Sequence, residues 1–141
     1  MNTAKILLYF MIINLGAVVW LFYTLAFPVQ IAVLHNEPFP VYPSEVKRGE
    51  EISWKVELTK TNDYRATVNR NIVCADGNLV TLARSETNAP LGERIILNGS
   101  VTVPLKTSLG ECYIEITPTY HINPLRDITK SYRTQSFNVI E

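Results

Sequence analysis

The sequence predicts a mainly β protein with a single N-terminal transmembrane helix followed by an antiparallel β-sandwich. Residues 6–34 contain no Asp, Glu, Lys or Arg, which is typical of a segment buried in lipid. Beyond residue 34, apolar side chains recur with a period of two, and Gly, Asn and Pro separate these stretches at roughly ten-residue spacing. No helical period occurs after residue 34, so we expect six to eight short strands.

Composition limits the classes of partner. The chain has 141 residues, which is room for one ordinary domain beside the helix. It carries 13 basic and 13 acidic residues, so its net charge is zero. Nucleic-acid binding usually needs a clustered positive face, and binding to anionic lipid usually needs a polybasic patch. We therefore expect no nucleic-acid partner, and contact with membrane lipid through residues 6–27.

Residues 6–27 are long enough to cross a bilayer, since about 20 apolar residues suffice. A cleaved signal peptide is the alternative. Its apolar core should be about 7–15 residues long and end in a small-x-small site. The run here is longer, and the best site, Thr24-Leu25-Ala26, is a poor match. The sequence therefore favours an uncleaved signal-anchor.

The flanking charges predict the orientation. Lys5 is the only cation before the apolar run, which favours a cytoplasmic N-terminus and an extracytoplasmic C-terminal domain. Lys47 and Arg48 oppose this bias, because they lie within about 20 residues of the other end.

We expect three parts along the chain. Residues 1–34 form the N-terminal tail and signal-anchor, 35–43 a proline-rich stalk, and 44–141 the sandwich. Prolines at 38, 40 and 43 remove backbone donors and favour extended backbone, which suits a stalk. An irregular edge strand, with Phe39 and Val41 on the sandwich, is the alternative.

Two strands carry a feature that conflicts with a simple alternation. In residues 66–74 the apolar face includes Arg70, and a charge on a core face requires a register shift or a partner. In residues 94–103, Asn98-Gly99 is a strong hairpin signal. That stretch is either two short strands or one bulged strand, and the short arms favour one strand.

The strand pattern resembles an immunoglobulin or fibronectin-III domain over about 40–141, at the level of the fold. Trp54 precedes both Cys74 and Cys112, whereas antibody-type domains have the Trp between the two Cys. Tyr113 follows the second Cys, so the tyrosine-corner spacing is absent. The anchor-plus-sandwich layout also resembles small membrane-anchored proteins of bacteria and their phages. The resemblance implies an Ig-like sandwich.

Cys74 and Cys112 are the only cysteines, and both fall in predicted exported strands. We expect a disulfide between them, because export leads to an oxidising compartment. Closing a loop of this length stabilises the fold by about 3–4 kcal/mol. Two separate buried thiols are the alternative.

No motif for catalysis or metal binding occurs. His35 and His121 are the only histidines, and neither has a partner at ligand spacing. There is no HExxH, CxxC, GxSxG or phosphate-binding glycine loop. We expect no catalytic residue, no metal and no cofactor, and hence a protein that is not an enzyme.

The last third of the sequence suggests a protein interface, because Tyr and Arg are favoured interface anchors. The loop 123–126 is the candidate contacting tip, since binding residues concentrate on loops. The candidate interface residues are Tyr113, Tyr120, Asn123, Arg126, Tyr132 and Arg133. Aromatic side chains that only cover an edge strand are the alternative.

Two functions remain. The first is a membrane-anchored extracytoplasmic binding or structural module that contacts a protein or envelope partner. The alternative is a small subunit of a membrane complex that acts through its transmembrane helix, where Asn14 could hydrogen-bond to a partner helix.

Overall fold

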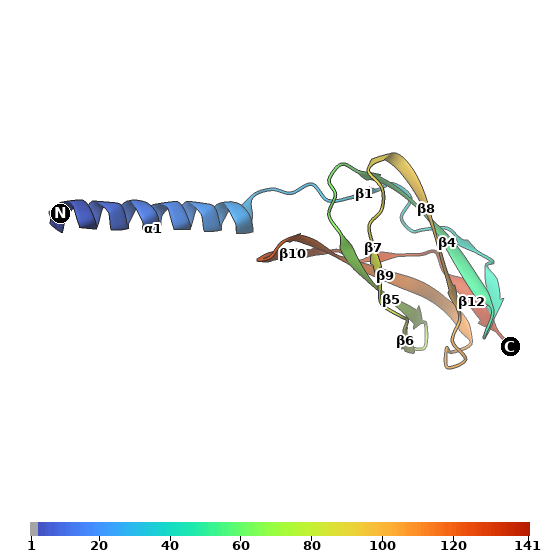
Figure 1. Cartoon of the computed structure of the whole chain (residues 1–141). Coiled ribbons are helices and arrows are strands. Elements are labelled where there is room, and N and C mark those ends of the chain that lie inside the picture. The colour runs from blue at the N-terminus through green and yellow to red at the C-terminus, as the bar shows by residue number, and fades with distance from the viewer. Residues whose placement is uncertain (1–2) are drawn as a thin grey trace.

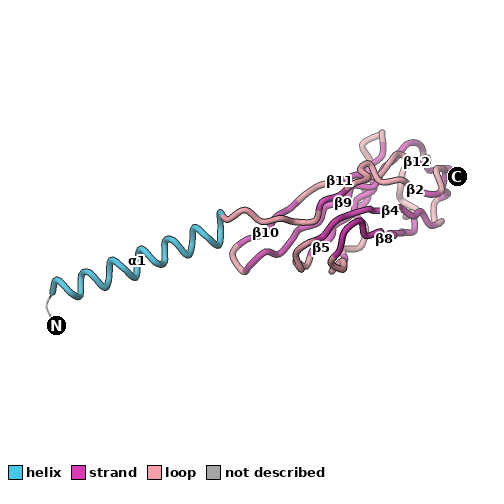
Figure 2. Tube along the Cα trace, turned by 90° about the horizontal axis from the view of Figure 1, so that it is seen from above, coloured by secondary structure: helices cyan, strands magenta, loops and turns pink. Residues whose placement is uncertain are grey.

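The computed structural model describes residues 3–141, and consists of one helix and two β-sheets packed face to face (Figure 1). Helix α1 (Thr3–Ala26) projects away from the sheets, and the C-terminus lies at the opposite end of the molecule (Figures 1 and 2). No residue of α1 is buried, and the helix is long and apolar enough to cross a membrane. The predicted mainly β class with one N-terminal apolar helix is confirmed.

The strands follow α1 in the order of their numbering. They are β1 (Val33–Leu34), β2 (Val41–Tyr42), β3 (Glu45–Lys47), β4 (Glu51–Lys60), β5 (Ala66–Cys74), β6 (Leu79–Thr81), β7 (Ser85–Thr87), β8 (Gly92–Thr102), β9 (Gly110–Asn123), β10 (Arg126–Thr129), β11 (Tyr132–Arg133) and β12 (Phe137–Ile140).

The smaller sheet is built around β4, which pairs with β8 along one edge and with β1 and β2 along the other. The larger sheet has the order β3-β12-β9-β5-β6, with β10 and β11 also on β9 and β7 also on β5. The β3–β12 pair is parallel and the other named pairs are antiparallel. The expected purely antiparallel arrangement is therefore corrected to a mixed one, because the short β3 runs alongside the last strand.

The core lies between the two sheets, where the predicted alternation places the apolar side chains. On β4, Ile52, Trp54 and Leu58 are buried. On the facing strands, Ile72 and Ile114 are completely buried. Because side chains alternate between the faces of a strand, this period of two produces one apolar face on each sheet.

Asn98-Gly99 lies inside a continuous β8, so the preferred interpretation of one strand is confirmed. The expected bulge at this pair is absent, since the β4–β8 register shifts only between Leu58 and Lys60. A glycine is needed here for packing, because a Cβ at Gly99 would lie 2.3 Å from Trp54 Cε2.

Arg70 stays on the core face of β5. The β5–β9 register runs without a break from Ala66 opposite Tyr120 to Cys74 opposite Cys112, so no bulge turns the arginine outward. Of the two expected solutions, the register shift is excluded, and the contacts that Arg70 makes are described below. At the end of the same ladder, Cys74 and Cys112 form the predicted disulfide.

Residues 35–43, expected as a stalk, lie along the edge of the sandwich as the edge-strand alternative describes. Phe39 is 1% exposed, and its backbone N–H donates to the carbonyl of Arg133 in the larger sheet at 3.0 Å. Pro40 O accepts from the N–H of Lys55 in the smaller sheet at 3.2 Å. This segment therefore closes one open edge between the sheets. The domain boundaries themselves stay predictions.

Candidate functional site

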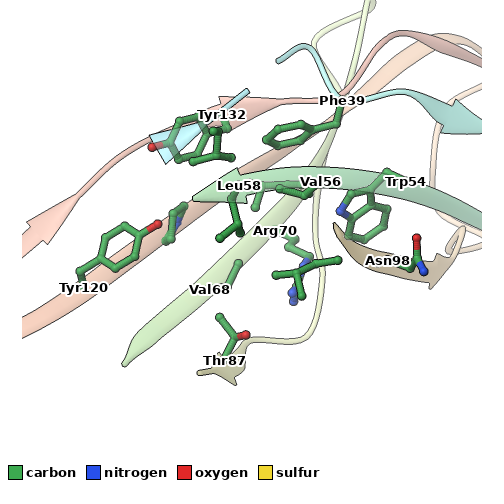
Figure 3. A pocket seen from close by; sticks show the side chains of 15 residues that line it. Phe39, Trp54, Val56, Leu58, Val68, Arg70, Thr87, Asn98, Tyr120 and Tyr132 are labelled. Carbon is green, nitrogen blue, oxygen red and sulfur yellow. The ribbon is translucent and has the colours of Figure 1, made fainter. Parts of the chain in front are cut away.

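A cavity of about 230 Å³ lies between the two sheets (Figure 3). Most of its wall is apolar, from Phe39, Leu58, Val68 and Tyr120. It is larger than the cavity of about 150 Å³ that admits benzene in another protein core. A space of this size and lining can hold a small apolar group.

The cavity reaches the surface along the edge formed by β7 and β8. In the ladders of the described residues, β7 pairs only with β5 and β8 only with β4, so no strand pairing joins the two sheets on this side. Thr87 and Asn98 line the cavity from these strands, and Asn98 is exposed. The opposite edge is closed by Phe39.

Arg70 is the one charged side chain in this lining. Its Nη1 donates to Ser85 Oγ at 2.6 Å, and its guanidinium lies 5.9 Å from the ring centroid of Trp54. Its Nε is buried and has no hydrogen-bond partner. Within residues 3–141, no carboxylate lies within ion-pair distance of it. Burial lowers the pKa of Arg70, because partial removal from water disfavours the charged form.

Lys60 offers a contrast within the same sandwich. It is 4% exposed, but its Nζ donates to Asn88 Oδ1 at 2.9 Å and to Ala89 O at 2.8 Å. Asp63 Oδ1 lies 3.7 Å from the same nitrogen. The lysine is thus satisfied by the chain itself, whereas the guanidinium of Arg70 is satisfied only in part.

Tyr120 and Tyr132, two of the predicted interface residues, also line the cavity. Tyr120 is 8% exposed, and burial raises its pKa to about 12. Burial, followed by the nearby charge of Glu37, raises the pKa of Tyr132. Both phenols are therefore neutral at physiological pH and add to an apolar wall.

Asn123, the last residue of β9, and Arg126, the first residue of β10, lie at the end of α1. Asn123 Nδ2 donates to Thr24 O at 2.9 Å, and Arg126 Nη1 donates to Phe27 O. The loop expected to touch a partner therefore contacts the chain's own helix. Figures 1 and 2 place β10 as the strand nearest the helix.

Tyr113 and Arg133 lie on the outer face of the larger sheet, since the alternate residues of β9 and β11 face inward. The six predicted interface residues thus fall into three places: the cavity, the helix end and the outer face. They do not form one surface, and their use in an interface stays a prediction.

The sequence reasoning missed a hydrogen-bonded chain on the outer face. Thr67 Oγ1 lies 2.7 Å from His121 Nε2, and His121 Nδ1 lies 2.9 Å from Asp127 Oδ1. This order of hydroxyl, imidazole and carboxylate is also that of a nucleophilic triad. Thr67 is only 5% exposed, however, so a substrate has no open path to its hydroxyl. The chain links β5, β9 and β10.

Residues 3–141 contain no group of three His, Cys, Asp or Glu side chains arranged to hold a metal ion. His35 shares a hydrogen bond of 2.8 Å with Thr59.

The sequence did not identify Trp54 and Gly99 as residues of a cavity. The one feature of the sequence that could have indicated the cavity is Arg70, an arginine at an inward-facing position of a strand.

No family model and no curated protein matches the chain. Among solved structures, the C-terminal domain of Wzt has a TM-score of 0.51 at 11% identity, over 79% of this chain and 75% of that one. A Niemann-Pick type C2 protein from Japanese carpenter ant has a TM-score of 0.49 at 13% identity, over 81% and 96%.

The alkylpurine DNA glycosylase AlkC of Pseudomonas fluorescens, bound to DNA with an abasic site analog, has a TM-score of 0.45 at 14% identity. The match covers 78% of this chain but only 30% of the glycosylase chain. At these identities a likeness concerns the fold alone, and the Wzt domain has a TM-score above 0.5. The chain therefore shares a two-sheet fold with that domain.

Proposed function

We propose that this protein is a single-pass membrane protein whose β-sandwich acts on the extracytoplasmic face as a non-enzymatic binding module for an envelope component. The observation that carries the proposal is the apolar cavity between the sheets, which is open at one edge and holds an unpaired cation. Concave, mostly apolar sites with few polar groups are the usual form of ligand sites.

The membrane part of the proposal rests on α1. Its large apolar side chains are exposed along the whole helix, with Phe22 at 71% and Ile13 at 69%. A continuous apolar surface of this size needs a covering, and a bilayer supplies one. Lys5 supports a cytoplasmic N-terminus. The Cys74–Cys112 disulfide suits an oxidising compartment on the other side.

The strand arrangement supports an Ig-like assignment. Immunoglobulin domains place their second and fifth strands in one sheet and their third, sixth and seventh in the other. Here β4 and β8 take the places of the second and fifth strands and share one sheet. β5, β9 and β12 take the places of the third, sixth and seventh strands and share the other sheet. The disulfide departs from that family, since it joins two neighbouring strands of one sheet.

The alternative function, a subunit acting through its helix, depends on Asn14 seeking a partner helix. Asn14 Nδ2 already donates to Phe10 O at 2.7 Å within α1. One of its two amide N–H groups therefore has a partner in its own helix, and the other N–H and the oxygen remain available to a partner helix. This alternative is kept as the second candidate function.

Site-specific crosslinking in native membranes tests the proposal. A photoreactive residue replaces Thr87, which lines the cavity, or the adjacent Glu86, which is exposed and faces away from it. We expect position 87 to capture an envelope component that position 86 does not capture. Identical products at both positions, or none at position 87, would contradict the proposal. Replacing residues 6–27 by polyleucine should leave the capture unchanged, and its loss would favour the helix alternative.

A further inference from the structure

We infer that the cavity takes a monoanionic amphiphile, with a single apolar chain between the sheets and a carboxylate at Arg70. This inference rests on the proposed binding function and names the class of ligand. The cavity, the charge and the open edge each contribute one part of it.

The positive charge of Arg70 indicates that the polar head group of the ligand is an anion. The guanidinium faces an apolar cavity, its Nε is buried without a partner, and its one hydrogen-bonding side chain is the neutral Ser85. Arg70 is half-buried, and a cation partly withdrawn from water gains from pairing with an anion. Arg forms its strongest contacts with carboxylates, through charge-assisted hydrogen bonds. A ligand carboxylate would supply the missing partner.

The apolar side chains that line the cavity indicate that the rest of the ligand is an apolar chain. Next to Arg70 the wall continues as apolar side chains from both sheets, including Leu58, Val68 and Ile116. At about 30 Å³ per non-hydrogen atom, a volume of 230 Å³ holds roughly eight such atoms. An acid with about six carbons, which has eight non-hydrogen atoms when its two oxygens are counted, matches this space, and a longer chain would exceed it.

The open edge sets how the ligand enters. Ser85 and Thr87 come from β7, and Asn98 comes from β8 across the gap. Figure 3 shows Thr87 and Asn98 at the border of the site and Arg70 between them and the interior. A carboxylate at Arg70 therefore remains close to polar side chains, while the apolar chain lies deeper, toward Tyr120 and Tyr132.

The test uses fluorescence of the full chain in nanodiscs of neutral phosphatidylcholine. Trp20 is replaced by Phe, so that Trp54 in the cavity wall is the single tryptophan. The probe is 2-bromohexanoate, whose bromine lies beside the carboxylate and therefore near Arg70 and Trp54, where it quenches the indole on contact. Its neutral match is 2-bromohexan-1-ol. A second chain with Trp54→Phe retains Trp20 in the helix and reports partitioning of each probe into the lipid.

We expect saturable quenching of Trp54 by the acid, with an affinity about tenfold or more above that of the alcohol, as expected for a hydrogen bond to a charged group. Arg70→Met should reduce the affinity for the acid to that of the alcohol. Arg70→Lys should retain a preference for the acid. Arg133→Met, which removes an exposed cation on the outer face, should change neither affinity.

Equal affinities of acid and alcohol in the otherwise unchanged chain would overturn the inference and leave the proposed binding function standing. No saturable quenching by either probe would overturn both. The comparison of the two probes needs no change at Arg70, so misfolding of Arg70→Met would not rescue the inference. Unchanged acid binding in a folded Arg70→Met chain would also overturn it.

Discussion

Gly99 lies so close to the indole of Trp54 that a Cβ at position 99 would stand 2.3 Å from Cε2 and 2.6 Å from Nε1. This contact joins β8 to β4, the two long strands of the smaller sheet. It also explains why a sequence pair typical of a turn lies in the middle of a strand: glycine provides the space that the indole occupies.

Gly99→Ala should therefore destabilise the sandwich by about 1–3 kcal/mol, the usual cost of forcing an extra methyl group into a packed site. The measurement is thermal unfolding of the full chain in detergent micelles. The matched control is Ser100→Ala at the next, exposed position of β8, which should change stability by less than about 0.5 kcal/mol. Equal stability of the two variants would show that the indole has room to move.

Removing the disulfide by Cys74→Ala together with Cys112→Ala should lower the free energy of unfolding by about 3–4 kcal/mol, because the bond closes a loop between residues 38 positions apart. Chemical denaturation of the oxidised and double-variant chains measures this difference. The reduced form of the unchanged chain serves as the control and should lose a similar amount. A loss below about 1 kcal/mol would contradict the expectation.

Alkaline pH should destabilise the sandwich through Tyr120. Its pKa is raised from 10.0 to about 12 by burial, so the folded state keeps the phenol neutral where the unfolded state ionises it. The contribution of the neutral Tyr120 phenol to the free energy of unfolding is complete below pH 10 and is lost as the pH rises toward about 12. Unfolding free energies across this range should fall less steeply in Tyr120→Phe.

Tyr42→Phe is the control for this pH dependence, since it removes a tyrosine that is 78% exposed. The free energies of unfolding of the two variants should depend differently on pH in the alkaline range. Below pH 10 the free energy of each variant should no longer change with pH through a tyrosine. An equal change of slope in both would contradict the assignment to Tyr120.

Asn123 and Arg126 should hold the sandwich in a fixed relation to α1. Asn123→Ala together with Arg126→Ala removes the two hydrogen bonds to the helix end, at Thr24 O and Phe27 O. Distance distributions between spin labels at the helix end and on β12 should broaden, while the unfolding temperature of the sandwich stays the same. Unchanged distributions would show that these hydrogen bonds do not set the orientation.

Local pattern was enough to predict the helix, the alternating faces of β4 and the presence of a disulfide. The apolar period places Ile52 and Trp54 on one face whatever the partner strand is. The same reasoning identified Arg70 as an arginine on a core face, which is the one sequence signal of the cavity.

Other features depend on contacts between distant residues and have no local signature. Phe39 and Pro40 close the sandwich only because Arg133 O accepts from the N–H of Phe39 and the N–H of Lys55 donates to Pro40 O, from two different sheets. Asn123 reaches Thr24 across a separation of 99 residues. A loop sequence rich in Asn, Pro and Arg is compatible with a partner contact or with this internal one, and the alternation alone does not decide between them.

The most direct test of the central claim is mass spectrometry of what the full chain carries when it is purified from its native membranes. Leu97→Phe enlarges a side chain in the cavity wall, and Ile96→Phe makes the same kind of change at the adjacent, exposed position. We expect about one small amphiphilic molecule per chain in the unchanged protein and in Ile96→Phe, and a strong loss in Leu97→Phe. The same amount in all three chains, or no bound molecule in any, would contradict a binding site between the sheets.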